Sequence, residues 1–239
     1  PTPLRPATCG LRPLLMEIRV SENPAIDCAS ILREAAGAGS HIALTGGSTP
    51  RDAYERAAAG GADWSAAKLW WGDERCVPPE DDLSNYRLAK ESLIDRLDPP
   101  PAEVHRIRGE LGPHEGADEY EQQLRAVDRL DLVLLGLGSD AHVASLFPGQ
   151  PTLDVTDRLV VGVEQAGLEP FVPRVSLTLP ALCDGRHIVF LVAGEGKAEA
   201  VERAFGGEPS RDAPASLVRP RDGRLTVLLD PAAASRLST

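Results

Sequence analysis

Cysteine and long apolar runs are scarce in this sequence of 239 residues. Its four cysteines, at positions 9, 28, 76 and 183, form no C-x-x-C pair and lack metal-ligand spacing, which argues against a disulfide framework and a zinc site. No apolar run approaches the roughly 18 residues that span a bilayer. The first fifteen residues lack the charged and apolar regions of a secretory signal. We therefore expect a cytoplasmic protein with free thiols and no membrane partner.

Basic residues are also scarce. The chain has 25 lysines and arginines against 36 aspartates and glutamates, which gives a formal net charge of −11 at neutral pH. The basic residues form no stripe or cluster, so the sequence argues against a nucleic-acid partner. Lysine occurs only at positions 68, 90 and 197. A site for an anion must therefore be locally positive within a repulsive overall field.

Apolar residues, by contrast, make up 42% of the chain, which is enough for the core of one α/β domain. Short apolar runs alternate with amphipathic stretches, and no repeat, low-complexity tract or long linker divides them. The predicted strands are 16–20, 41–44, 68–71, 104–106, 130–135, 159–163, 188–192 and 225–229. The predicted helices are 23–36, 50–58, 84–97, 116–127, 179–183, 197–205 and 231–236.

This alternation predicts an α/β fold with a mostly parallel, doubly wound (Rossmann-like) sheet and helices on both faces. Because Met16 is the only methionine, residues 1–15 are expected to be an N-terminal extension outside the fold, and residues 16–239 a single domain. Ligands of open α/β sheets bind beyond the carboxyl ends of the strands. Motifs that follow strands are therefore the first candidates for a functional site.

The most informative such motif is Gly136–Gly149, GLGSDAHVASLFPG, which follows the apolar strand 130–135. A glycine-rich turn at a strand end brings backbone close to a ligand. Asp140 and His142 lie two residues apart in it. An imidazole can take a proton from water near neutral pH and return it, and a neighbouring carboxylate can hold the ring. The alternative is a loop with a solvated aspartate and histidine.

Two further motifs also follow strands. In the segment 42–50, IALTGGSTP, a strand leads into two glycines and then a helix, for which Thr49 is a suitable N-cap and Pro50 a suitable first residue. Such a turn can direct N–H groups at an anion, although it matches neither a Walker A loop nor a G-x-G-x-x-G fingerprint. In the segment 69–78, LWWGDERCVP, a strand ends in a charged turn. An ordinary connecting turn is the alternative for both. With Lys197, which follows the strand 188–192, these motifs can meet in one crevice.

Together the motifs resemble the 6-phosphogluconolactonase family, within the larger group that includes glucosamine-6-phosphate deaminases. The resemblance extends from about residue 14 to about residue 237. It rests on six motifs in order: 45–50 (TGGSTP), 71–75 (WGDER), 84–86 (SNY), 136–149, 174–178 (RVSLT) and 193–198 (AGEGKA). One residue departs from the pattern, because the family has glycine between the aspartate and the histidine where this chain has Ala141. A positive φ there would strain the alanine by about 1 kcal/mol.

The resemblance implies hydrolysis of 6-phospho-D-glucono-1,5-lactone to 6-phosphogluconate in the oxidative pentose phosphate pathway. His142 would activate the attacking water and return its proton to the departing ring oxygen. Asp73 and Asp140 are both candidates to orient His142 or to bind sugar hydroxyls. Arg75 would stabilise the oxyanion or steer the anionic substrate. Glu74 is expected to be structural.

The same resemblance assigns the ligand contacts. The phosphate would be held by the turn at 46–49 together with a guanidinium and an ammonium: Gly46, Gly47, Ser48, Thr49, Arg174 and Lys197. Asn85 would contact the sugar. We expect no cofactor and no metal, and a monomer or weak homodimer. The other four histidines, at 41, 105, 114 and 187, are expected at the surface or at strand edges.

Two alternative functions remain at this stage: an isomerase/deaminase of amino-sugar phosphates, and a non-enzymatic sugar-phosphate sensor. A sensor would normally carry a helix-turn-helix, for which the residues before Met16 are too few. The resembling deaminases place a glutamate five residues beyond the catalytic histidine, where this chain has Phe147. Ser145 lacks the G-x-S-x-G elbow of a nucleophilic serine. These features favour the lactonase.

Overall fold

The structure is a computed structural model that describes residues 16–237. The expected extension at 1–15, including Cys9, lies outside the described residues. Seven strands form one sheet in which every neighbouring pair is parallel, in the order β1-β10-β9-β6-β2-β3-β5. Their bounds are β1 Met16–Val20, β2 His41–Leu44, β3 Lys68–Trp71, β5 Glu103–Val104, β6 Leu132–Leu135, β9 His187–Val192 and β10 Arg224–Leu229. The predicted parallel sheet is confirmed.

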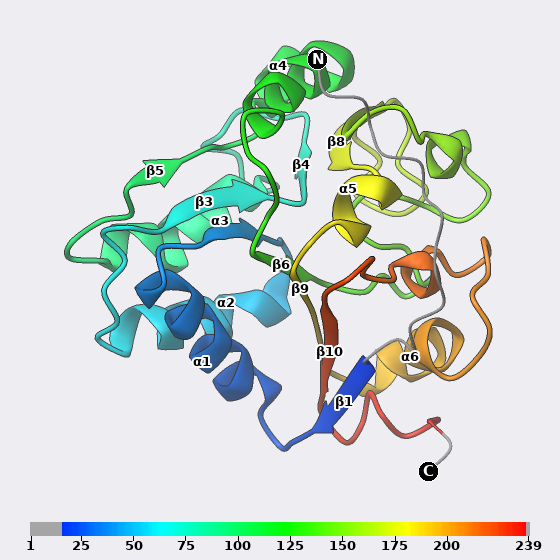
Figure 1. Cartoon of the computed structure of the whole chain (residues 1–239). Helices are drawn as coiled ribbons and strands as arrows, with labels where there is room; N and C mark the ends of the chain where they lie inside the picture. Colours follow the sequence, from blue (N-terminus) through cyan, green and yellow to red (C-terminus); the bar gives the residue numbers. More distant parts are fainter. Residues whose placement is uncertain (1–15, 238–239) are drawn as a thin grey trace.

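Residues 16–237 contain six α-helices: α1 Pro24–Gly37, α2 Ser48–Ala59, α3 Asn85–Ser92, α4 Pro113–Leu124, α5 Leu179–Cys183 and α6 Ala198–Phe205. Figure 1 shows α1 and α2 on one side of the sheet, and α4, α5 and α6 on the other. Because both faces are covered, every residue of β6 and β9 is buried, and all of them except His187 are apolar. This layering confirms the predicted doubly wound architecture.

A second, antiparallel sheet of three strands was missed by the sequence analysis. It contains β4 Asp73–Arg75, β8 Arg174–Leu177 and β7 Val160–Val163 in the order β4-β8-β7. Only β7 corresponds to a predicted strand. The prediction placed β4 in a charged turn because Asp-Glu-Arg has no apolar periodicity, and such a short strand depends on tertiary pairing. In the register of this sheet Arg75 lies opposite Arg174.

Several predicted helices also differ from the observed ones, including α4, which spans residues 113–124 rather than 116–127. Residues 231–236 form consecutive turns rather than a helix. The predicted helix 84–97 ends at Ser92, because Leu93 leaves helical geometry (φ −128°, ψ −69°), and a short 3-10 helix follows at Ile94–Arg96. Helix α2 begins at Ser48 with Gly47 as its N-cap, two residues before the predicted start, so Thr49 is not the cap. The positive φ of Gly47, 102°, permits this earlier start.

The sheet opens between β2 and β6 at the carboxyl ends of these strands. Strand β2 pairs with β3 as far as Leu44, and β6 pairs with β9 as far as Leu135. The pairing between β2 and β6 themselves covers only Ile42 and Ala43 of β2. The strands that follow β2 and β6 extend the sheet in opposite directions, which makes this position a topological switch point. A ligand site is expected in the crevice there.

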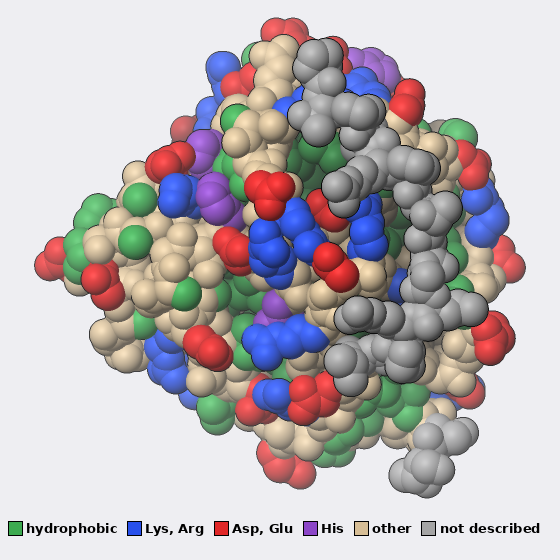
Figure 2. Space-filling view, viewed as in Figure 1, with side chains coloured by type: hydrophobic (Ala, Val, Ile, Leu, Met, Phe, Trp, Pro, Cys, Tyr) green, Lys and Arg blue, Asp and Glu red, His purple; other side chains and the backbone are tan. Residues whose placement is uncertain are grey.

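The surface carries charges of both signs (Figure 2), and the described cysteines are free thiols. Figure 2 shows acidic and basic side chains interleaved over the face seen in Figure 1. Among residues 16–237, no helix is both long and apolar enough to cross a membrane. Cys28, Cys76 and Cys183 carry no disulfide.

Candidate active site

One cavity of about 240 Å³ lies at this opening, beyond the carboxyl ends of β2, β6 and β9. Ten of the eleven predicted site residues line it, from segments that are up to 151 positions apart in the sequence. They are Gly46, Gly47, Ser48, Thr49, Asp73, Arg75, Asn85, His142, Arg174 and Lys197. The eleventh, Asp140, is behind His142. The strand-end motifs therefore do meet in one crevice.

The His142 ring is held by Asp140. Its Nδ1 lies 2.6 Å from Oδ1 of Asp140, and the same oxygen accepts the backbone N–H of His142 at 3.1 Å. This geometry puts the proton of the neutral ring on Nδ1 and leaves Nε2 available to a ligand in the cavity. Burial alone would raise the pKa of Asp140, but its hydrogen bond and charge interaction with His142 outweigh this and lower it. Asp140 therefore stays ionised beside the His142 ring.

The loop that carries His142 is wound tightly by unusual backbone geometry. Ala141 and Ala144 both have a positive φ, 66° and 50°. The loop is closed by hydrogen bonds from Gly138 N–H to the His142 carbonyl and from Ala141 N–H to the Gly138 carbonyl, both 3.0 Å. A Cβ at Gly138 would lie 2.0 Å from His142 Nδ1, so only glycine fits there. Ala141, which replaces the glycine of the family pattern, thus has left-handed backbone geometry, which strains an alanine by about 1 kcal/mol.

Asp73 also lines the cavity, and within residues 16–237 none of its hydrogen bonds involves His142. The residue is 6% exposed. Ser145 Oγ donates to its Oδ2 at 2.7 Å, and Asn85 Nδ2 donates to its Oδ1 at 3.3 Å. The structure thus separates the two aspartates that the sequence left equivalent: Asp140 contacts the histidine, and Asp73 does not.

Ser145 itself is a site-supporting residue that the sequence analysis missed. It is fully buried, its backbone N–H donates to Ser176 Oγ at 3.1 Å, and its hydroxyl proton is directed at Asp73. It therefore links the His142 loop to β4 and β8. No sequence signal marked this role, because a lone serine in a loop matches no motif.

Glu74 and Ser84 together place Asn85 in the cavity. The buried Glu74 carboxylate accepts the backbone N–H groups of Asn85 and Tyr86 at 2.7 and 2.8 Å, and the Ser84 hydroxyl at 3.0 Å. Burial raises the pKa of Glu74 despite these bonds. Asn85 Oδ1 is buried and has no partner among the described residues. A Cβ at Gly46 would lie 1.7 Å from that oxygen. Asn85 therefore packs directly on the turn Gly46–Thr49, called the glycine turn below.

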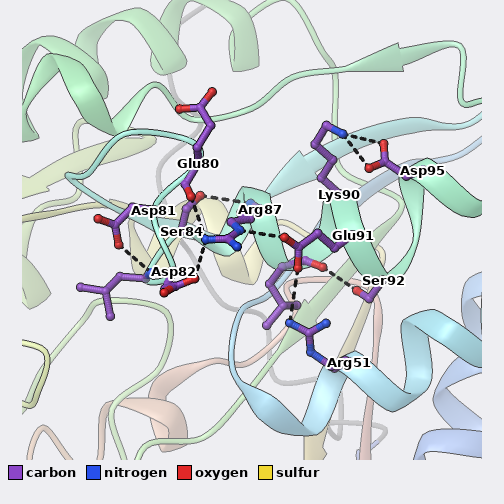
Figure 3. Close-up of polar contacts among 12 residues, drawn as sticks. Arg51, Glu80, Asp81, Asp82, Ser84, Arg87, Lys90, Glu91, Ser92 and Asp95 are labelled. Carbon is purple, nitrogen blue, oxygen red and sulfur yellow. Dashed lines mark hydrogen bonds and ion pairs between the residues drawn. The ribbon is translucent and has the colours of Figure 1, made fainter.

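Outside the cavity, exposed ion pairs hold the same segment (Figure 3). Arg87 pairs with Asp82 and Glu91 and donates to the Glu80 carbonyl, and Lys90 pairs with Asp95. Each exposed pair contributes little, up to about 1 kcal/mol. The contacts of Arg87 with Asp82 and Glu80 fasten the loop 80–84 to α3, whose first residue is Asn85.

Three cations line the cavity, and among the described residues none of them forms an ion pair. Arg174 is 4% exposed and donates Nε to the Val172 carbonyl (3.1 Å) and Nη2 to the Pro170 carbonyl (2.7 Å). Burial and the neighbouring Arg75 lower the pKa of Arg174. Arg75 donates Nη1 to the Leu83 carbonyl at 2.5 Å, and its buried Nε lacks a partner. Lys197 donates to the Leu137 carbonyl at 2.6 Å, and burial lowers its pKa.

The glycine turn completes this positive region. No side chain caps the N-terminus of α2, so its first N–H groups and the positive end of the helix dipole are available to an anion. Because the cations have only carbonyl partners, the cavity offers charge that an anionic ligand can neutralise. Phe147, whose ring centroid is 4.6 Å from that of His142, also lines the cavity.

The comparisons with known proteins agree with this geometry. A family model described as "Glucosamine-6-phosphate isomerases/6-phosphogluconolactonase" matches residues 20–227. The chain belongs to this family. It is 41% identical over 211 residues to a 6-phosphogluconolactonase of Streptomyces coelicolor, covering 82% of this chain and 77% of that one. A 6-phosphogluconolactonase of a Nostoc species is 38% identical over 209 residues, covering 82% and 84%.

Solved structures show the same relationship. The 6-phosphogluconolactonase of Trypanosoma brucei has a TM-score of 0.81 at 26% identity, covering 94% of this chain and 99% of that one. A monomeric glucosamine-6-phosphate deaminase has a TM-score of 0.80 at 18% identity, covering 93% and 99%, which shows a shared fold only. The fold thus accommodates both activities, and the site must distinguish them.

Proposed function

We propose that this chain hydrolyses 6-phospho-D-glucono-1,5-lactone to 6-phosphogluconate, in the oxidative pentose phosphate pathway. The curated relatives with this name support the assignment. The observation that carries it is the His142–Asp140 pair, in a cavity that also holds three cations without ion pairs. Such a cavity combines a base that can activate water with a place for a phosphate dianion.

His142 Nε2 acts as the general base. It takes a proton from a water molecule whose oxygen attacks the lactone carbonyl carbon. The resulting tetrahedral intermediate collapses, the bond from that carbon to the ring oxygen breaks, and His142 returns the proton to the ring oxygen. Asp140 stabilises the imidazolium in between and keeps the ring in the correct orientation. Loss of a general base typically costs about 10²–10⁴-fold in rate.

The phosphate lies at the glycine turn, Gly46–Thr49, with Arg174 and Lys197. Two nitrogens of Arg174 are bonded to loop carbonyls, so its Nη1 is the nitrogen directed to the phosphate, while Lys197 contributes a compact charge. Arg75 stabilises the oxyanion or steers the substrate.

Asp73 and Asn85 bind sugar hydroxyls. The Asp73 carboxylate is held by neutral donors, so its charge remains available to hydroxyl donors of the substrate. Asn85, which lines the same cavity, is the second candidate for such a contact.

The test compares two reactions. We expect rapid opening of 6-phosphogluconolactone, corrected for the spontaneous reaction, and negligible ammonia release from glucosamine 6-phosphate. Phe147 stands where the deaminases have a glutamate, and its ring packs near His142; phenylalanine cannot relay a proton for sugar ring opening. Ammonia release at a rate comparable to lactone hydrolysis would overturn the assignment in favour of the deaminase. We further expect a cytoplasmic enzyme, monomeric or weakly dimeric.

A further inference from the structure

Two buried tyrosines bind the backbone at the ends of neighbouring strands. Tyr54 of α2 donates its hydroxyl to the Thr45 carbonyl at 2.7 Å and accepts the Thr45 N–H at 2.9 Å. Tyr120 of α4 does the same for Trp71, at 3.0 and 2.8 Å. Both tyrosines are 0% exposed. One phenol therefore satisfies both hydrogen-bonding groups of one residue in each case.

The Tyr54 contact is a consequence of the opening between β2 and β6. Thr45 follows β2, where the pairing with β6 has already ended. It is 5% exposed, so its N–H and carbonyl need a partner that neither water nor a strand supplies. The Tyr54 hydroxyl supplies it. Burial raises the pKa of Tyr54, so the hydroxyl keeps the proton that it donates.

Thr45 leads directly into the glycine turn. Gly46 and Gly47 follow it, and α2 starts at Ser48. Tyr54 lies on that same helix, so the turn is fixed from both sides: by the chain through Ser48, and by the phenol at Thr45. Gly46 is in addition packed against Asn85. Tyr54 thus holds the residue from which the chain enters the turn.

We propose that Tyr54 is a positioning residue for phosphate, acting through Thr45 to hold the turn that receives the phosphate group of the substrate. This inference rests on the proposed function for the identity of the substrate. Tyr120 provides a matched comparison, because the same contact at Trp71 fixes the segment that leads to Asp73 rather than the glycine turn.

The test measures binding of inorganic phosphate by isothermal titration calorimetry to the unmodified protein, Tyr54→Phe and Tyr120→Phe. Both variants keep the ring and lose only the hydroxyl. We expect Tyr54→Phe to weaken phosphate binding about 10-fold and Tyr120→Phe to change it less than about 2-fold. In kinetics, Tyr54→Phe should raise KM for the phosphorylated lactone about 10-fold and leave KM for the unphosphorylated lactone unchanged.

Equal phosphate affinity in the unmodified protein and Tyr54→Phe, or equal losses in both variants, would overturn the proposal. An unmodified protein that binds no phosphate would overturn it as well. A protein that binds phosphate in this Tyr54-dependent way and yet leaves the lactone intact would refute the proposed function alone.

If Tyr54→Phe does not fold, hydrogen exchange in the unmodified protein tests the coupling between bound phosphate and Thr45. Phosphate should slow amide hydrogen exchange at Thr45, whose N–H is bonded to Tyr54, and leave exchange at Trp71 unchanged. Unchanged exchange at Thr45 with bound phosphate would contradict the coupling.

Discussion

Arginines at the two ends of the parallel sheet have different partners. At the amino end, Arg186, which precedes β9, pairs with Asp128 and Asp131 at 3.1 and 3.3 Å, and Arg221, which precedes β10, pairs with Asp184 at 3.4 Å. At the carboxyl end, Arg75 and Arg174 bond to backbone carbonyls, and no ion pair to either is formed within residues 16–237. Charge is neutralised internally at one end and left for a ligand at the other.

Histidines follow the same division. His187 begins β9 at the amino end, where its Nε2 lies 3.0 Å from Thr226 Oγ1. Burial, followed by nearby Arg224 and Arg19, lowers its pKa to about 4, so it stays neutral near pH 7. His142 at the carboxyl end has a carboxylate on Nδ1 and a cavity beside the ring. The two ends of the sheet thus give these two histidines different surroundings.

The largest effect is expected for the two histidines. His142→Asn should lower the rate of lactone hydrolysis by about 10²–10⁴-fold with little change in KM, because the base is lost and the phosphate contacts remain. His187→Asn serves as control and should stay within about 3-fold of the unmodified rate. Stopped-flow or pH-stat hydrolysis measures both. Near-normal turnover in folded His142→Asn would remove this residue from the mechanism.

The next largest effect is expected on ligand binding when a basic side chain of the cavity is removed. Arg174→Ala and Lys197→Ala should each weaken 6-phosphogluconate binding by about 1.5–3 kcal/mol, the usual value of a charge-assisted hydrogen bond. Arg186→Ala removes an equally charged but paired side chain at the amino end, and should change binding less than about 2-fold. Calorimetric titration of the three variants makes the comparison. Equal losses in all three would mean that only overall charge matters.

A smaller effect is expected from Ser145→Ala. The variant removes one of the two side-chain donors that hold Asp73, and we expect an approximately 10-fold lower kcat/KM for the lactone. Ser92→Ala is a suitable control, since Ser92 is equally buried but donates only to a helix carbonyl, that of Leu88. An unchanged kcat/KM in Ser145→Ala would show that Asp73 needs no such support.

The smallest effect is expected for Ala141→Gly. Relief of about 1 kcal/mol of strain is offset by the greater freedom of glycine in the unfolded chain, about 0.4–1 kcal/mol, so Tm should move by less than about 2 °C. Ala204→Gly, inside α6 and equally buried, has no strain to relieve and should lower Tm by about 2–4 °C. Scanning calorimetry measures both Tm values. An equal decrease of Tm in the two variants would show that Ala141 is not strained.

The sequence predicted those parts of the protein that local patterns determine. Apolar runs marked the parallel strands, and the rule that ligands bind at carboxyl ends brought the segments at Thr45, Gly136 and Ala193 to one crevice. The family resemblance added the candidates His142 and Arg174. Their roles remain predictions, although the structure brings them to the same cavity.

The remaining features depend on tertiary contacts that leave no local signal. The short strand β4 pairs only with β8, and its three charged residues lack the apolar alternation by which a strand is predicted. The division between Asp73 and Asp140 follows from their hydrogen-bond partners in the folded chain, Ser145 and Asn85 for Asp73 and His142 for Asp140. Tyr54 looks like an ordinary core residue of an amphipathic helix, and only the folded structure shows its hydroxyl on the Thr45 backbone.

The most direct test of the central claim is the ratio of kcat/KM for 6-phosphogluconolactone to that for the unphosphorylated gluconolactone. If the cations at the carboxyl end are kept for a phosphate, the ratio should be at least about 100, the value of one or more charge-assisted bonds. It should fall toward 1 in the Arg174→Ala, Lys197→Ala double variant. A ratio near 1 in the unmodified protein would contradict the account.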